Sequence, residues 1–369
     1  MKLEKKPLYP NIKYCLRCCM PETSEGLRFD EMGICSGCQS SEHKMHINWV
    51  EREKKLQEIL NKHRNNNGTN YDCIVPISGG KDSCFQLHVL VNVYKMKPLA
   101  VTFSHNWFTE VGEYNLKNIL EKLNVDHMMF TPNRALVNKI AKQSLYSIGD
   151  SCWHCHAGVG AYPLKAAIMT KIPLMVWGES IAEAGNKATY ADDNWEPVKF
   201  DRDYYLKVSS KVEPEKMVND ELSMKDLYPF ELPSVEDVEQ ANIEGIHLGD
   251  YIFWDGERQT EFLKKEYDWR EGDVEGTYKG YKSCECKMPG VHDYAKFIKR
   301  GFGRTTDHVS QDVRTGLLTR EEGFELIRKF ETKPPKALDE YLDITGIDKD
   351  EFYKVLKGMR TGKAKSIED

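Results

Sequence analysis

The stretch Ser78-Gly79-Gly80-Lys81-Asp82-Ser83 is the part of this 369-residue chain that decides its fold. It follows an apolar run over 71–77 and leads into a predicted helix over 84–96. A strand, a glycine-rich turn and a helix together present backbone N–H groups and a helix N-terminus to phosphate. The spacing differs from the Walker pattern G-x-x-x-x-G-K. The stretch therefore predicts a phosphate-binding loop; the alternative is a plain glycine turn.

Strand-like and helix-like segments alternate on either side of this loop. Ranges 71–77, 98–104, 126–131 and 173–178 have the pattern of strands, and 84–96, 112–123, 133–146 and 157–171 have the pattern of helices. Such alternation predicts an α/β fold, a Rossmann-like parallel sheet covered on both faces. Ligands of these sheets bind at the carboxyl ends of the strands. Ser104, Gly178 and Glu179 stand at such ends.

The rest of the chain divides by composition. Residues 1–47 are predicted to be a cysteine-rich metal-binding segment, 48–70 a helix and linker, and 71–200 the nucleotide-binding core. Residues 201–318 are predicted to complete the core and bind substrate, with one strand near 246–254. The last segment, 319–369, is predicted to be helical, because Thr319 and Asp348 each have N-cap spacing to a glutamate.

The bulk composition limits the class of protein. The chain is 40% hydrophobic and 30% charged, with a net charge of −6, which argues against a dominant nucleic-acid surface. No apolar run has the length of a membrane span, and the start of the sequence lacks a signal-peptide core. We expect a cytoplasmic protein, in which the 11 cysteines are ligands, catalytic groups or core residues rather than disulfides.

Two CxxC pairs lie near the start of the sequence, Cys15 with Cys18 and Cys35 with Cys38. Four thiolates at this spacing can close a tetrahedral Zn²⁺ site with a folding role and no catalysis. Cys19 is adjacent, but Cys18 has the better knuckle spacing. The alternative is a set of buried or reactive thiols without a metal.

The sequence SGGxDS resembles the pyrophosphate loop of the ATP-pyrophosphatase superfamily. These enzymes adenylate a carbonyl or carboxyl oxygen and then displace AMP with nitrogen or sulfur. In this interpretation the backbone of 78–80 approaches the phosphates of ATP, and the Ser83 hydroxyl donates to them. Asp82 accompanies Mg²⁺, and Lys81 adds positive charge unless it points to solvent. Ser104 and Gly178 are assigned to the same ATP site. Glu179 is predicted to orient substrate or metal, or to accept a proton; a surface glutamate is the alternative.

A third cysteine group is formed by Cys152 and Cys155, with Cys286 slightly preferred over Cys284 as a later partner. In ATP-pyrophosphatases that thiolate tRNA, a similar set binds an iron–sulfur cluster or transfers sulfur. The third cysteine group is therefore predicted to bind an iron–sulfur cluster or a second zinc ion, or only to pack. His154 and His156 are alternative ligands or acid–base groups.

The segment Gly301 to Arg314 combines glycine, arginine and aspartate before a helix. Arg304 and Arg314, together with His156, are candidate contacts for an anionic or hydroxyl-rich substrate. A salt-bridged helix start explains the two arginines equally well.

Taken together, the motifs resemble the N-acetyl sugar amidotransferase family, which makes acetamidino sugars of bacterial surface glycans. The resemblance covers nearly the whole chain and rests on CLRCCMPET…FDEMGICSGC, PISGGKDS, SCWHCH, VWGES and GFGRTTDHVSQDVRTG. It implies that an acetamido oxygen is adenylated by MgATP and that ammonia then displaces AMP from the O-adenylyl imidate. It also implies that a separate glutamine amidotransferase, with a cyclase-like partner, supplies the ammonia.

Two other readings compete with this family. A thiolase of tRNA or of a small molecule would use the same loop with sulfur as the nucleophile. The third cysteine group favours it, while the acidic net charge and the lack of an evident RNA-binding module weigh against it. The other hypothesis is a non-enzymatic zinc-knuckle interaction protein that kept an ATP-binding fold. The intact SGGKDS loop argues against it.

Overall fold

A parallel sheet of five strands forms the centre of the computed structural model, within the residues that it describes (6–64, 70–183, 188–190 and 202–368). The strands are β1 (Cys73–Pro76), β2 (Pro98–Phe103), β3 (His127–Phe130), β4 (Leu174–Trp177) and β5 (Glu244–His247). Their order across the sheet is β3-β2-β1-β4-β5. The predicted α/β class is confirmed. Most of the predicted linker 65–70, and the predicted boundary between 200 and 201, lie outside the described residues.

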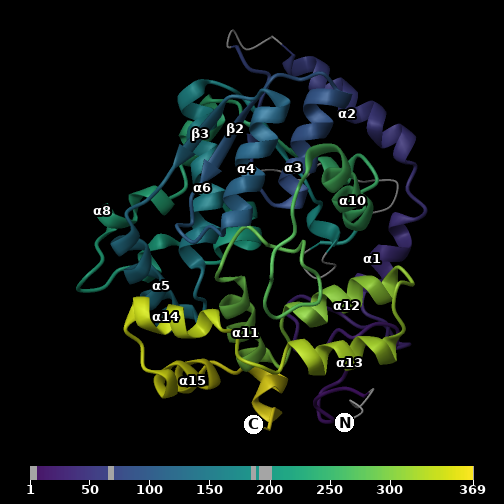
Figure 1. Ribbon diagram of the computed structural model, residues 1–369, viewed down its shortest axis with the longest axis vertical. Helices are drawn as coiled ribbons and strands as arrows, with labels where there is room; N and C mark the ends of the chain where they lie inside the picture. Colours follow the sequence, from purple (N-terminus) through teal and green to yellow (C-terminus); the bar gives the residue numbers. More distant parts are fainter. Residues whose placement is uncertain (1–5, 65–69, 184–187, 191–201, 369) are drawn as a thin grey trace.

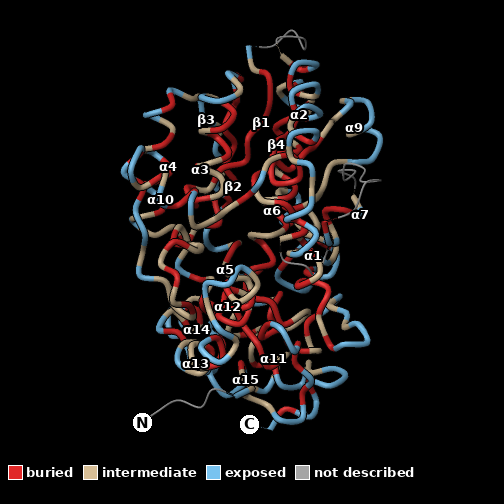
Figure 2. The backbone as a smooth tube through the Cα atoms, turned by 90° about the vertical axis from the view of Figure 1, so that its right-hand side faces the viewer, coloured by how far each residue is buried: buried red, intermediate tan, exposed pale blue. Residues whose placement is uncertain are grey.

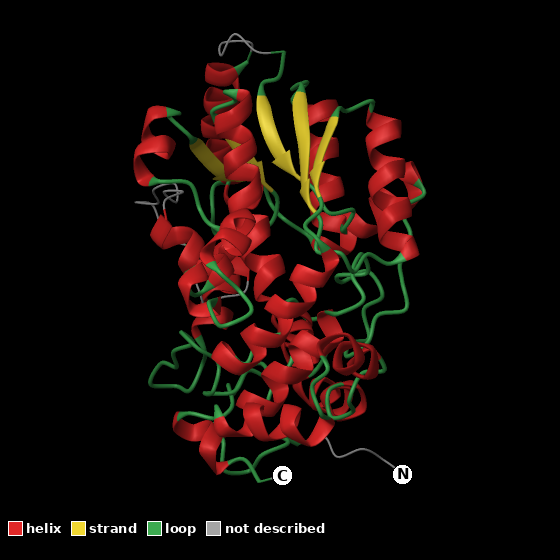
Figure 3. Ribbon diagram, turned by 90° about the vertical axis from the view of Figure 1, so that its left-hand side faces the viewer, coloured by secondary structure: helices red, strands yellow, loops and turns green. Residues whose placement is uncertain are grey.

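Helices cover both faces of the sheet (Figures 1 and 3). Cys73 and Val75 of β1 share one apolar core with α2 (Trp49–His63), α3 (Lys81–His88), α4 (Glu110–Leu123) and α10 (Gly256–Tyr267). Ile74, which points to the opposite face, packs with Leu164 and Ala167 of α6 (Trp153–Thr170). Because successive side chains of a strand alternate, the uninterrupted apolar run of β1 fills both cores. Figure 2 shows β1 and β2 as buried segments of this half of the molecule, whereas the edge strand β3 alternates between exposed and partly buried residues.

A second, helical layer lies beyond the carboxyl ends of the strands, in the lower half of Figure 1. Its helices are α11 (Pro289–Arg300), α12 (Arg304–Arg314), α13 (Arg320–Phe330), α14 (Ala337–Thr345) and α15 (Lys349–Gly358). Tyr341 and Phe352 are fully buried in its core, which also receives Leu145 of α5 (Arg134–Ile148). The remaining helices are α1 (Ser36–Lys44), α7 (Arg202–Tyr205), α8 (Met224–Leu227) and α9 (Val235–Gln240).

The two predicted helix starts of the C-terminal segment are confirmed. The Thr319 side chain accepts from the Glu322 N–H while the Glu322 carboxylate accepts from the Thr319 N–H, which is a complete capping box. Asp348 accepts from the backbone N–H groups of Asp350 and Glu351. These bonds satisfy N–H groups that have no partner within their own helix.

Several bounds differ from prediction; the helix predicted over 157–171, for example, begins at Trp153. The helix predicted over 84–96 begins earlier, at Lys81, and ends in a π-helical turn at Val89–Val93. It begins there because Gly80 has extended dihedrals and acts as the N-cap, which places Asp82 in the first turn, where the helix dipole favours a carboxylate. The strand predicted near 246–254 is also shorter and earlier, because the chain turns at Leu248–Asp250.

Candidate functional site

A cavity of about 1040 Å³ lies between the carboxyl ends of the strands and the helical layer. Its lining includes the loops after β1, β2 and β4, the first turns of α6, the segment from Lys207 to Lys211, and the segment from Tyr281 into α12. The N-terminal cysteine-rich segment reaches its rim with Met20 and Gly26. The fold therefore brings most of the predicted site segments to one cavity.

The loop after β1 requires glycine at position 79. Gly79 has φ +88°, and a Cβ there would lie 2.7 Å from the carbonyl oxygen of Gly112 in α4. The Trp269 Nε1–H donates to the Gly79 carbonyl at 2.9 Å, which fixes the turn from the other side. No side chain caps α3 at Gly80. A tight glycine turn leading into an uncapped helix start fits the binding of phosphate oxygens.

Lys81 and Asp82 are paired at the start of α3. The buried Lys81 ammonium bonds the Asp82 carboxylate, which also accepts from Trp254 Nε1 at 3.0 Å. Burial alone would raise the pKa of Asp82, but Lys81 and then Lys282 lower it below its ordinary value. Burial, and next the charge of Lys81, lower the pKa of Lys282. Asp82 is therefore an ionised carboxylate suited to accompany Mg²⁺, with two ammonium groups at hand for phosphate.

Glu179 follows β4 and lines the cavity. Burial raises its pKa, and the neighbouring Asp82 raises it further, so this carboxyl is the more basic of the two. A Cβ at Gly178 would come within 2.9 Å of Gln86 Oε1, which explains the glycine there. Ser104 does not reach the cavity: it is buried, and its hydroxyl accepts from the Asn106 N–H at 3.2 Å.

Glu285 covers the phosphate loop. Its carboxylate accepts from the Ser78 hydroxyl at 3.3 Å, and a Cβ on Gly80 would lie 2.8 Å from Oε1. The backbone of Glu285 is held beside α4, since its carbonyl accepts from the Thr109 N–H at 3.1 Å. Burial raises the pKa of Glu285, and its Oε2 is buried with no hydrogen-bond partner among the described residues. A buried carboxylate at a phosphate cradle repels phosphate unless it is protonated or a cation lies between them.

The thiols of Cys15, Cys18, Cys35 and Cys38 converge, and all four are fully buried. The sulfurs of Cys15 and Cys38 are 3.8 Å apart, and those of Cys18 and Cys35 are 3.6 Å apart. A tetrahedral ion with bonds of about 2.3 Å to sulfur holds its ligands about 3.8 Å apart. The spacing therefore fits one tetrahedral ion, and it is too short for a cluster in which each thiolate binds a different iron.

Cys19 and Arg314 lie beside this four-cysteine cluster without belonging to it. Cys19 packs with Phe324 in an apolar core, and its thiol donates to the Arg320 carbonyl at 3.5 Å. The Arg314 guanidinium approaches the Cys18 and Cys35 sulfurs at 3.8 Å each. A Cβ on Gly37 would meet this guanidinium at 2.4 Å, so the glycine of the knuckle also makes room for Arg314. Arg314 lines the cavity as well, where its predicted substrate role stays a prediction.

Cys152, Cys155 and Cys286 all line the cavity, so the fold brings the third cysteine group to one place. Cys286 arrives through a bridge to Phe108 in the loop that follows β2. Among the described residues, these three sulfurs do not form a tight ligand group like that of the N-terminal cysteines. At least one pair of these sulfurs is therefore more than 4.8 Å apart. Burial raises the pKa of each of the three thiols. An iron–sulfur cluster, a zinc ion and simple packing all stay predictions.

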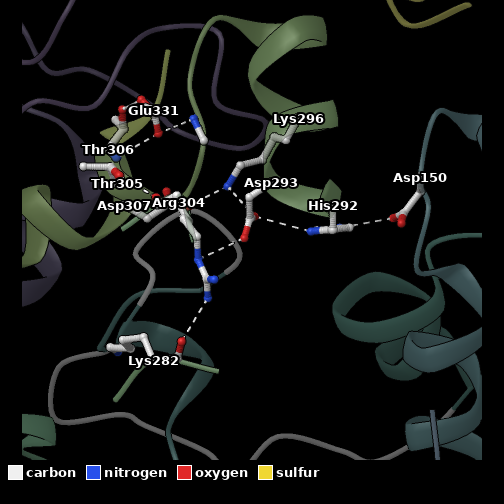
Figure 4. A network of polar contacts seen from close by, with 12 residues as sticks. Asp150, Lys282, His292, Asp293, Lys296, Arg304, Thr305, Thr306, Asp307 and Glu331 are labelled. Atoms are coloured by element: carbon white, nitrogen blue, oxygen red, sulfur yellow. Dashed lines mark hydrogen bonds and ion pairs between the residues drawn. The ribbon is translucent and has the colours of Figure 1, made fainter. Parts of the chain in front are cut away.

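Arg304 and His156 occupy different positions relative to the cavity. Arg304 is buried outside its lining; its Nε lies 3.2 Å from Asp293 Oδ2, and a second nitrogen donates to the Lys282 carbonyl at 3.3 Å (Figure 4). Arg304 therefore supports the cavity wall, and its predicted substrate contact is untested. His156 lines the cavity, with Nδ1 at 3.9 Å from Asp150 Oδ2.

Sequence reasoning missed several charged residues of the cavity wall. Lys282 and Glu285 lie close in sequence to the candidate ligands Cys284 and Cys286, but the spacing of charged residues around them predicts no site. Asp293, Lys296 and Arg300 recur at helical spacing, which would have placed them on one face of α11. Asp150 and His292 meet only because the turn before α6 lies against α11, so no local pattern contains this pair.

The C-terminal part of the chain is similar to a described protein family. Residues 275–365 match the family described as "LPS biosynthesis protein WbpG-like, C-terminal domain". The chain is 29% identical over 328 residues to "Uncharacterized protein MJ1599" of Methanocaldococcus jannaschii, covering 88% of this chain and 96% of that protein. A solved U34-tRNA thiolase, NcsA from Methanococcus maripaludis with its [4Fe-4S] cluster, aligns over 91% of this chain and 98% of its own, at 12% identity and a TM-score of 0.34.

Among the described residues, none of the helices combines the length and the apolar character that a bilayer crossing requires.

Proposed function

We propose that the protein is an ATP-dependent amidotransferase that converts the acetamido group of a sugar into an acetamidino group during surface-glycan synthesis. The proposal rests on one observation: the same cavity is lined by the SGGKDS loop and by α11 and α12. These two helices lie in the part of the chain similar to WbpG-like LPS biosynthesis proteins. ATP would supply the adenylyl group, and Mg²⁺ would neutralise phosphate charge. In the first step, the amide oxygen would attack the α-phosphorus of ATP, forming an O-adenylyl imidate while pyrophosphate leaves. In the second step, ammonia would add at the imidate carbon and AMP would leave.

Different residues of the cavity would bind the phosphates and assist the attack of ammonia. The loop 78–83 would hold the phosphates, with Asp82 toward Mg²⁺ and Lys81 and Lys282 toward the charge on pyrophosphate. Glu179, whose pKa burial raises, would accept a proton from the incoming amine. Bound ATP and sugar would fill the cavity and so keep water from the activated amide. In this proposal the enzyme works in the cytoplasm, a glutamine amidotransferase subunit with a cyclase-like partner supplies ammonia, and the four-cysteine cluster holds Zn²⁺.

A direct assay tests the proposal. Purified protein is incubated with MgATP, ammonium and N-acetyl sugars, both nucleotide-linked and free nonulosonic acids. We expect AMP and pyrophosphate to form only when sugar is present. The product should be lighter than the amide by the difference between an oxygen atom and an NH group. Sugar-independent AMP formation, or an unchanged sugar mass, would contradict the proposal.

The second candidate is a thiolase with an iron–sulfur cluster, and the open spacing of Cys152, Cys155 and Cys286 in the cavity favours it. Three cysteine ligands would leave one iron exposed to a sulfur donor. Anaerobic purification, followed by iron analysis and an assay of sulfur incorporation into tRNA, separates the candidates. Sulfur transfer without any sugar would replace the amidotransferase with the thiolase.

A further inference from the structure

Beside the third cysteine group, one carboxylate faces two imidazoles. Asp150 lies in the turn before α6, where Oδ1 accepts from the Cys152 N–H at 2.8 Å and is thereby fixed. Its other oxygen, Oδ2, lies 3.5 Å from His292 Nε2 and 3.9 Å from His156 Nδ1. One ligand atom from each of the three residues fits within a 4.8 Å span. We propose that Asp150, His156 and His292 bind a divalent ion of the Zn²⁺ type.

The distances suit a metal ion with small adjustments. Tetrahedral bonds of about 2.1 Å place ligand atoms roughly 3.4 Å apart, so the Asp150–His292 pair already has this spacing. His156 Nδ1, at 3.9 Å from Asp150 Oδ2, lies farther from Asp150 than this spacing, so its ring would move toward Asp150 when an ion binds. His156 is half-buried in the first turns of α6, and its ring is perpendicular to that of His292 at 5.1 Å between centroids, with ligand atoms of both rings and of Asp150 within 4.8 Å of one another.

The surroundings of His292 are those of a metal ligand. Its second nitrogen, Nδ1, lies 3.3 Å from Asp293 Oδ1, and the other oxygen of Asp293 lies 3.2 Å from Arg304 Nε (Figure 4). A histidine that binds a metal generally donates its remaining N–H to a carboxylate, which fixes the ring and strengthens the ligand. Here that carboxylate is itself anchored by a buried arginine. This arrangement orients His292 toward Asp150, as Figure 4 shows.

The donor set and its position define the kind of site. Two imidazoles and one carboxylate select borderline ions such as Zn²⁺, Fe²⁺ or Co²⁺ over Mg²⁺ or Ca²⁺. Three protein ligands leave a fourth position open, and His156 and His292 both line the cavity, so this position faces it. The closed four-cysteine cluster has no such position.

Lys211 is the competitor for this site. Its Nζ lies 3.1 Å from Asp150 Oδ2, and its side chain is 42% exposed, so it can swing toward solvent when an ion binds. Removing this ammonium should strengthen metal binding, because the ion would no longer displace a positive charge. Lys211→Met is therefore predicted to tighten binding about tenfold.

Cobalt binding to the full-length protein tests the site without ATP or sugar, so its outcome is independent of the proposed function. We expect one Co²⁺ with thiolate charge-transfer bands, from the four-cysteine cluster, and one more with ligand-field bands alone. Asp150→Asn and His156→Ala should each remove only the second ion, whereas His46→Ala, on an exposed turn, should keep both. Lys211→Met provides a gain-of-binding arm that does not depend on the folding of the other variants. Absence of a second ion in both the natural chain and Lys211→Met overturns the proposal, as does a second ion with thiolate bands.

Discussion

Two cysteine groups of this molecule differ in how their ligands are held. The four-cysteine cluster is local: two CxxC turns, 16 residues apart, close a buried set at tetrahedral spacing. Cys152, Cys155 and Cys286 come from one helix start and a segment more than a hundred residues later, and they line an open cavity. The comparison teaches that closed, local spacing suits a structural ion, while an open wall built from distant segments suits chemistry.

The largest effect is expected from Cys38→Ser. Removing one ligand should release the ion, and the N-terminal segment should then unfold. Structural zinc contributes roughly 10 kcal/mol to the folding of small zinc domains, so we expect a loss of about 3 kcal/mol or more here. Metal analysis and thermal unfolding measure both effects. Cys155→Ser is the matched control, with a cost below about 1 kcal/mol; equal destabilisation by the two variants would erase the distinction between closed and open groups.

Asp82→Ala is next, because it affects the cavity alone. Loss of the carboxylate beside Mg²⁺ should lower AMP formation by roughly a hundredfold or more, while the metal content of the four-cysteine cluster stays unchanged. The exposed Asp343→Ala provides the control for loss of an aspartate. If AMP formation survives the change at position 82, the assignment of the phosphate loop is wrong.

Gly79→Ala tests the shape of the loop rather than its charge. The new Cβ would face the Gly112 carbonyl at 2.7 Å and adopt a left-handed φ, at a combined cost of about 1–3 kcal/mol. ATP affinity, measured by calorimetry, should fall about tenfold. Gly316→Ala separates the two causes, since Gly316 has φ +78° and no neighbour within 4 Å. It should lower stability slightly and leave ATP binding intact.

Glu285→Gln tests the carboxylate that covers the loop. The amide keeps the contact with Ser78 and removes the negative charge, so Mg²⁺-free ATP should bind about fivefold more tightly, or about 1 kcal/mol. Equilibrium dialysis with labelled ATP and excess chelator measures this change. Unchanged affinity would mean that Glu285 is already protonated or moves away from the phosphates.

What the sequence could predict follows the same division between local and distant contacts. The strand–turn–helix around Gly79, the Thr319 capping box and the four thiols are encoded within a few dozen residues, and the structure has them. The start of α3 at Lys81 was missed because it depends on the extended conformation of Gly80, which the residue pattern around the loop does not predict. The Asp150–His292 contact depends on how α11 lies against α6, which no periodicity records.

The smallest effect is expected from Cys19→Ala, and it tests the boundary of the closed cluster. Cys19 directly follows the ligand Cys18, yet its buried thiol packs beside Phe324 and donates to the Arg320 carbonyl. Removing the thiol deletes one buried sulfur, at a cost of about 1 kcal/mol in stability, but it removes no metal ligand. The metal content of Cys19→Ala should therefore equal that of the natural chain, whereas Cys18→Ala should abolish metal binding. A loss of metal in Cys19→Ala would mean that the two adjacent thiols exchange as ligands, and that CxxC spacing alone does not select between them.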